Sequence, residues 1–170
     1  MTTAPAPPPP DSRALDRAAE LISAASRPVV IAGRQCRSPE DAEWLRAFAE
    51  ALPAPVLTTE KAQGVLPEAH PLSFGTFTGR DQDDAVLGLA DLIVTFGLDP
   101  DELNLGGWPY AAVAVHLSRA PHAGYPFMPL VEVVGDLALS LEELAPRLRG
   151  KTRADWDMFQ LARLRKTRAP

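Results

Sequence analysis

Short apolar runs that alternate with helical segments constrain the fold of this chain more than any other feature of its sequence. The first run, "VVIAG", ends at Gly33. Four more follow: "APVLTT" at 54–59, "DLIVTFG" at 91–97, "AAVAVHLS" at 111–118 and "PLVEVVG" at 129–135. Continuous runs of this length are typical of strands buried on both faces of a parallel sheet. The alternation predicts an α/β fold, a mainly parallel sheet with helices on both faces.

Helices are predicted between these runs from their capping residues and apolar stripes. The first begins at Asp11 or Ser12, the second at Ser38, and the last core helix at Ser140, in a capping box with Glu143. A further helix is expected near 81–89, and residues 60–79 are expected to form a long loop. The residues expected to face inward are Leu15, Ala18, Ile22, Ala25, Ala42, Leu45, Phe48, Ala49, Leu52, Leu141, Leu144, Ala145 and Leu148.

Composition divides the chain into three parts and excludes several function classes. Residues 1–12 are rich in Pro and Ala and are predicted to be a disordered leader, 13–150 form the domain, and the basic 151–170 are a linker or docking helix outside the core. The net charge of -5 argues against nucleic acid and anionic membranes as partners. No apolar run approaches the ~20 residues that span a bilayer, and no secretory signal is present, so we expect a cytoplasmic protein.

Polar residues and glycines follow the predicted strands, where a parallel sheet gathers its ligands. These rim segments are 33–34, 58–61, 97–99 and 116–118. A dinucleotide fingerprint needs three glycines, and this first turn supplies Gly33 alone, so an NAD pyrophosphate is not expected there. Thr58, Thr59 and Lys61 suit a ribose or phosphate, or simple strand-end capping. Gly75, Gly79 and Gly97 permit close backbone approach to a flat ligand, or only turns.

No catalytic constellation stands out in this sequence. Cys36 is the single cysteine, which excludes an internal disulfide and a cysteine metal cluster, and it is interpreted as a small turn residue. The three histidines lack the paired spacing of a zinc site. His116 is interpreted as a hydrogen-bonded structural residue, and Asp99 and Asp101 as turn residues.

The order of four segments resembles the central domain of thiamine-diphosphate-dependent enzymes, a superfamily that includes acetolactate synthase and benzoylformate decarboxylase. The segments are "AAELISAASRPVVIAGRQ", "FAEALPAPVLTTEKAQGVLPEAHPLSFG", "ADLIVTFGLDPDEL" and "VEVVGDLALSLEELAPRL", and the resemblance covers about Leu15 to Leu148. It implies a three-layer, Rossmann-like sheet of five to six strands. It also implies two further domains, in the same enzyme or a partner subunit, that bind the pyrimidine and the diphosphate of thiamine diphosphate with Mg²⁺, in a homo-oligomeric parent enzyme.

Neither catalytic domain is present in this sequence. Gly135-Asp136 is not followed by an Asn-Asn pair, so Asp136 is interpreted as a turn or cap residue and not a metal ligand. Some members of the thiamine-diphosphate-dependent superfamily bind FAD or ADP in the central domain. The residues that match those contact regions are Gly33, Arg34, Thr58, Thr59, Lys61, Gly75, Gly79, Gly97 and Asp99.

Two departures from the flavin-binding pattern favour a decarboxylase-like domain with an empty or vestigial pocket. The fourth strand runs into "VHLSRAPH" instead of an acidic run, and the third is followed by "GLDPDEL". The resemblance therefore implies a non-catalytic central domain of a 2-oxo-acid decarboxylase or synthase. The alternative is a stand-alone module that binds FAD, ADP or NAD.

Overall fold

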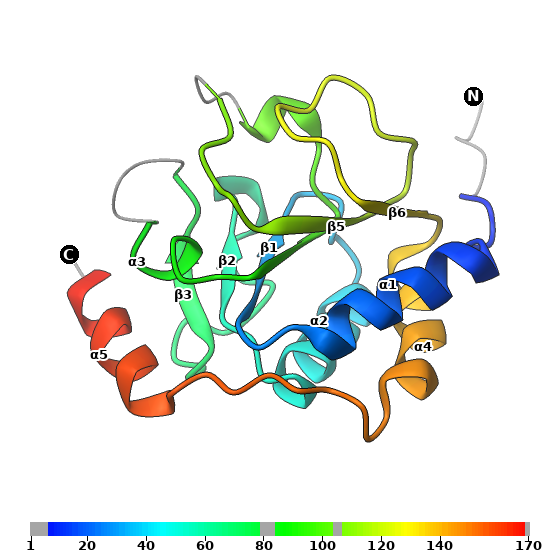
Figure 1. Cartoon of the computed structure of the whole chain (residues 1–170). Helices are drawn as coiled ribbons and strands as arrows, with labels where there is room; N and C mark the ends of the chain where they lie inside the picture. The colour runs from blue at the N-terminus through cyan, green and yellow to red at the C-terminus, as the bar shows by residue number, and fades with distance from the viewer. Residues whose placement is uncertain (1–6, 79–83, 104–106, 169–170) are drawn as a thin grey trace.

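A single six-stranded parallel sheet forms the middle layer of the protein. In the computed structural model, which describes residues 7–78, 84–103 and 107–168, the strands are β1 Pro28–Ala32, β2 Val56–Thr58, β3 Ser73–Thr76, β4 Leu92–Phe96, β5 Val113–Ser118 and β6 Val131–Val134 (Figure 1). Their order is β3-β2-β1-β4-β5-β6, and each neighbouring pair is parallel. The predicted α/β, Rossmann-like fold is confirmed.

The winding of the sheet reverses between β1 and β4. From β1 the chain moves outward through β2 to β3, then returns to place β4 on the other side of β1. Val30 pairs with Val94 and Ala32 with Phe96, so both strands end at the same level. This topological switch point is where open α/β sheets bind ligands.

The strand β3 corrects the prediction of a long loop at 60–79. Ser73–Thr76 reads "SFGT", which shows no apolar run, and the backbone at Gly75 has a φ of 83°. The strand lies at the sheet edge, with a register irregularity against β2. An edge strand needs apolar contacts on fewer sides, so its sequence signal is weak.

Three amphipathic helices cover one face of the sheet: α1 Ser12–Ala24, α2 Pro39–Ala51 and α4 Leu137–Leu148 (Figure 1). The caps of the first two are confirmed, because Asp11 accepts from the Ala14 amide and Ser38 forms a capping box with Asp41. All but two of the residues predicted to face inward are buried; Ala145 is exposed and Ala42 is half-buried.

The predicted start of α4 is wrong. The helix begins after Asp136, whose Oδ2 accepts from the Leu139 amide at 2.9 Å. Ser140 lies one turn inside, and its hydroxyl donates to the Asp136 carbonyl at 2.8 Å. Two N-cap candidates stand four residues apart, and the first one caps the helix. Asp136 is therefore the cap residue that the sequence also suggested.

The opposite face is covered by α3 Asp84–Leu87, the 3-10 turn η3 Pro100–Leu103 and α5 Met158–Arg168. The expectation that residues 151–170 lie outside the core is wrong for two of them. Trp156 and Leu161 are buried in the core cluster, and the Trp156 indole donates to the Pro28 carbonyl at 2.9 Å. Arg165 donates to the carbonyls of Ser73 and Glu68, which fastens α5 against β3.

The disordered leader at residues 1–12 stays a prediction, and the structure describes its residues from Pro7 onward. Pro8 and Pro10 run beside Gly135, where an added Cβ would lie 2.8 Å from the Pro8 carbonyl oxygen. The described part of the leader thus contacts the start of α4. Within the described ranges, no helix combines the length and apolarity that a membrane crossing requires.

Candidate functional site

The carboxylate of Glu102 is the centre of the polar rim at the switch point. The turn η3 folds back after β4 and brings this side chain over the end of β1. Its Oε1 accepts from the Arg34 amide at 2.9 Å and from the Thr59 hydroxyl at 2.6 Å, and its Oε2 accepts from the Asp99 amide at 2.8 Å. One carboxylate therefore ties together the ends of β1, β2 and β4.

Arg34 turns its guanidinium toward the same acidic turn. Its Nε lies 2.5 Å from Asp99 Oδ2, and its Nη1 lies 2.8 Å from Asp101 Oδ2. The bond to Asp99 has the largest effect and raises the pKa of Arg34 above its ordinary value; burial opposes it, and the bond to Asp101 adds a smaller increase. The positive charge at the switch point is thus already paired with two carboxylates of the protein.

Gln35 links this cluster to the end of β5. Its Nε2 donates to Asp99 Oδ1 at 2.6 Å and to Ser118 Oγ at 3.1 Å, and its Oε1 accepts from the Arg119 amide at 2.9 Å. Tyr125 adds a further bond by donating its hydroxyl to the Leu98 carbonyl. The rim segments after β1, β4 and β5 therefore form one continuous hydrogen-bonded network.

Two glycines at the rim serve close packing within the protein. A Cβ on Gly33 would lie 2.6 Å from Glu102 Oε2 and 2.6 Å from the Leu98 Cα. A Cβ on Gly97 would lie 2.9 Å from a methyl carbon of Leu137 and 3.1 Å from Cys36 Sγ, and its φ of 68° favours glycine. At Gly97, one of the glycines for which the sequence indicated close approach, the approaching atoms belong to the protein's own Gln35, Cys36 and Leu137.

The structure brings together five of the nine predicted site residues: Gly33, Arg34, Thr59, Gly97 and Asp99. Three others make no hydrogen bond within this group, although Lys61 lines a depression together with Arg34 and Thr59. Thr58 is buried within β2, Lys61 is exposed on the 3-10 turn η1 Glu60–Ala62, and Gly75 lies on the edge strand β3. Gly79 lies outside the described residues. Their role in binding a cofactor stays a prediction.

Glu102 and Gln35 are the residues that sequence reasoning missed. The stretch "LDPDEL" was read as a turn, and its three acids have no spacing that shows which one reaches back to β1. The signal was positional. A short acidic turn directly after a rim glycine can fold onto the amides of a neighbouring strand end, as Glu102 does here.

His116 lies buried at the end of β5 inside an aromatic box. Its Nδ1 lies 2.7 Å from the Thr95 hydroxyl, and the rings of Tyr125, Phe127 and His122 surround it at centroid distances of 4.7, 5.6 and 5.8 Å. Its Nε2 has no hydrogen-bond partner among the described residues. Burial, with a smaller contribution from His122, lowers the pKa of His116 to about 4, so the imidazole is neutral near pH 7. The structural interpretation of His116 fits this environment.

Cys36 carries no reactive thiol in this fold. It is buried, its Sγ lies 3.7 Å from the Phe96 carbonyl oxygen, and burial raises the pKa of the thiol. Within the described ranges, no group of His, Cys, Asp or Glu side chains is arranged to hold a metal ion. The described part of the rim therefore offers binding chemistry but no nucleophile or metal centre.

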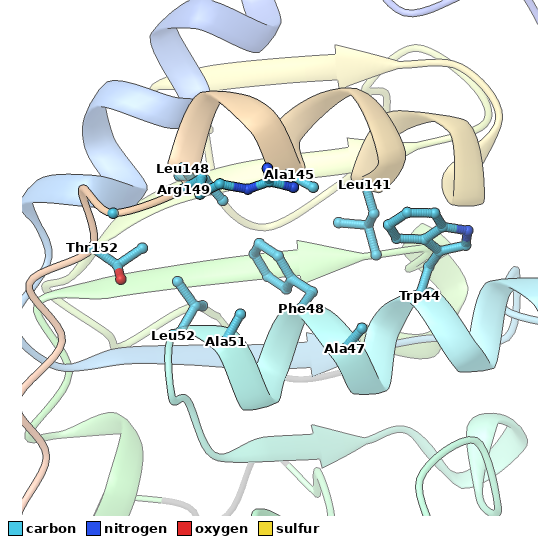
Figure 2. A pocket seen from close by; sticks show the side chains of 11 residues that line it. Trp44, Ala47, Phe48, Ala51, Leu52, Leu141, Ala145, Leu148, Arg149 and Thr152 are labelled. Carbon is cyan, nitrogen blue, oxygen red and sulfur yellow. The ribbon is translucent and has the colours of Figure 1, made fainter.

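An apolar groove of about 350 Å³ lies between α2 and α4, away from the rim network. Figure 2 shows Trp44 and Phe48 from α2 facing Leu141 from α4 across it. Arg149 is the charged residue in its lining. Such a surface supports packing, and it supplies no acid–base pair for catalysis.

Comparison with known proteins agrees with this architecture. The model of the family described as "Thiamine pyrophosphate enzyme, central domain" matches residues 15–144. The catabolic acetolactate synthase of Raoultella terrigena is 31% identical over 143 residues, which cover 79% of this chain and 25% of that protein. Acetolactate synthase isozyme 1 large subunit of Escherichia coli is 33% identical over 147 residues, which cover 82% of this chain and 25% of the relative.

A solved structure shows the same fold. Benzoylformate decarboxylase from Polynucleobacter necessarius superposes with a TM-score of 0.72 at 25% identity, and the match covers 93% of this chain and 30% of that one. The chain thus spans about a quarter of the length of the relatives it matches in sequence.

Proposed function

Because this chain belongs to the family of thiamine pyrophosphate enzyme central domains, we propose that it is the non-catalytic middle domain of a 2-oxo-acid decarboxylase or synthase. The match over residues 15–144, in relatives about four times as long, is the observation that carries this proposal. Its role is to hold the two catalytic domains in position and to contribute to a homo-oligomeric parent enzyme in the cytoplasm.

The chemistry of the described residues supports a structural role. The acids at the rim accept hydrogen bonds from the protein itself, His116 is neutral, and Cys36 is buried. Among the described residues, no nucleophile lies beside both a general base and a group that could stabilise the charge that develops during a reaction. The sheet and its two covered faces instead give a rigid body that suits the middle of a multidomain enzyme.

Thiamine diphosphate and Mg²⁺ belong, in this proposal, to domains outside this sequence. The residue that most resembles a metal ligand is Asp136, and it does not fit that role. Its carboxylate caps α4 and lies 3.6 Å from Arg119 Nη2. The described residues hold no metal-binding group beside it. The catalytic steps therefore lie in the partner domains.

A nucleotide in this domain, FAD or ADP, fits the rim poorly. The amides of Arg34 and Asp99 bind Glu102, and the Arg34 guanidinium is paired with Asp99 and Asp101. A phosphate would need these same donors. The alternative of a stand-alone nucleotide-binding module is weaker for the same reason.

Reconstitution tests the proposed function. The purified chain is mixed with a chain that carries the pyrimidine- and diphosphate-binding domains, and release of CO₂ from a 2-oxo acid is measured with thiamine diphosphate and Mg²⁺. We expect activity only when the two chains are mixed. Trp156→Ala, which removes a buried anchor of α5, serves as a folding-defective control. Turnover by the chain by itself, or full activity of the partner domains without it, would overturn the proposal.

A further inference from the structure

We propose that the Glu102 carboxylate is a built-in anion that fills the phosphate position of the rim, so that the native domain excludes FAD and ADP, and that removal of this side chain opens a site for phosphate. The inference concerns the rim of this chain alone and does not depend on the catalytic partners. Three features of the described residues carry it: the donors, the space and the charge.

The donors around Glu102 are those that a phosphate uses. Two are backbone amides, of Arg34 and Asp99, at 2.9 and 2.8 Å, and one is the Thr59 hydroxyl at 2.6 Å. They come from the carboxyl ends of three neighbouring strands at the switch point, and Thr59 is buried. Convergent amides and a hydroxyl of this kind form an anion-binding cradle. Here the anion belongs to the protein.

The approach to the Gly33 backbone is filled by the protein itself. In nucleotide-binding α/β folds the first glycine turn allows the ligand to approach the backbone. Over Gly33, a single added carbon would lie 2.6 Å from Glu102 Oε2, 2.6 Å from the Leu98 Cα and 2.7 Å from the Gly97 carbonyl oxygen. The turn after β4 therefore occupies the approach to Gly33.

The charge at this position also opposes a nucleotide. The guanidinium of Arg34 already contacts Asp99 and Asp101, and Glu102 accepts from the Arg34 amide. A diphosphate would bring further negative charge beside these carboxylates, and like charges at short range repel. Lys61 lines two depressions of about 600 and 570 Å³, and Arg34 lines both of them, but Lys61 is exposed and makes no hydrogen bond to the Glu102 cradle.

Calorimetric titration of the full chain with inorganic phosphate, ADP and FAD, at constant ionic strength, tests the proposal. Wild type should show no saturable binding. Glu102→Ala should bind phosphate at least about tenfold more tightly than wild type, because vacated charge-assisted donors are worth that much. The matched control is Asp101→Ala, which removes a carboxylate and a partner of Arg34 from the same turn but leaves the cradle filled, and its gain in phosphate binding should be clearly smaller than that of Glu102→Ala.

Saturable binding of ADP or FAD by wild type would overturn the proposal. So would a folded Glu102→Ala variant that binds phosphate no better than wild type. Amide hydrogen exchange of the wild-type chain keeps the test decisive if that variant does not fold. The amides of Arg34 and Asp99 lie outside the strands, and they should exchange at least about tenfold more slowly than free amides because Glu102 holds them. Unprotected exchange at both positions would contradict the proposal.

Discussion

The rim of this sheet contains two polar side chains in contrasting surroundings, the half-buried Glu102 and the buried His116. At the ends of β1 and β4, Glu102 accepts hydrogen bonds from three strand ends. At the end of β5, His116 has one partner, Thr95, and an Nε2 with none among the described residues. Burying a charge is costly unless it is bonded, whereas an imidazole can stay neutral. Both groups lie at the rim, but they differ in how many hydrogen-bond partners surround them.

Gly33→Ala should reduce stability more than any other variant considered, because its new Cβ would clash directly with the Glu102 carboxylate. The new Cβ would meet Glu102 Oε2, Leu98 Cα and the Gly97 carbonyl oxygen within 2.7 Å. Two of these atoms belong to the backbone, so the turn after β4 must shift. We expect a loss of about 3 kcal/mol or more in the free energy of unfolding, measured with urea.

Gly75→Ala is the matched control for that measurement. A Cβ there would meet nothing within 4 Å, and its cost comes from the φ of 83° alone. A loss of about 1 kcal/mol is expected. Equal losses in the free energy of unfolding of the two variants would show that the turn after β4 does not pack tightly against Gly33.

Low pH should reduce the stability of the folded protein through His116. The pKa of His116 is lowered to about 4 in the folded protein, so between pH 6.5 and 4 the unfolded chain binds a proton that the native chain does not. Stability is therefore lost as the pH falls through this window, by about 3 kcal/mol in total. Urea unfolding at several pH values measures this loss.

His116→Phe should remove this part of the acid sensitivity, since the phenyl ring does not titrate and the Thr95 hydroxyl can still donate to the Val115 carbonyl. If His116→Phe loses stability in acid as wild type does, burial of His116 is not the cause.

Glu102→Gln should give a smaller loss, because the amide keeps the shape of the side chain and one acceptor oxygen. It loses the charge-assisted bonds to Arg34 and Asp99, which predicts a cost of about 2 kcal/mol in the free energy of unfolding. Asp101→Asn, at a carboxylate that is 63% exposed, should cost less than about 1 kcal/mol. If Asp101→Asn cost more stability than Glu102→Gln, the exposed carboxylate would matter more than the one bonded to the strand ends, and the prediction would be wrong.

The sequence predicted much of the fold because its strongest signals are local. The caps at Asp11 and Ser38 and the apolar strands β1, β4 and β5 each depend on residues close in the chain. The edge strand β3 lacked such a signal, and the first helix turn at 137–140 offered two competing caps. Trp156 was missed as a core residue because its burial depends on a distant carbonyl, that of Pro28.

The site was less predictable for the same physical reason. Position at strand ends was enough to gather Gly33, Arg34, Thr59 and Asp99, since a parallel sheet aligns those ends. Which of the acids in "LDPDEL" would bind them depends on how η3 folds across the rim, because Arg34 and Glu102 are 68 positions apart in the chain. No local pattern encodes that contact.

The most direct measurement is a crystal structure of the full chain grown with saturating ADP. We predict electron density for the Glu102 carboxylate between the amides of Arg34 and Asp99, and no phosphate over Gly33. A nucleotide phosphate bound to those amides, with Glu102 turned out to solvent, would contradict the view that this domain supplies its own anion.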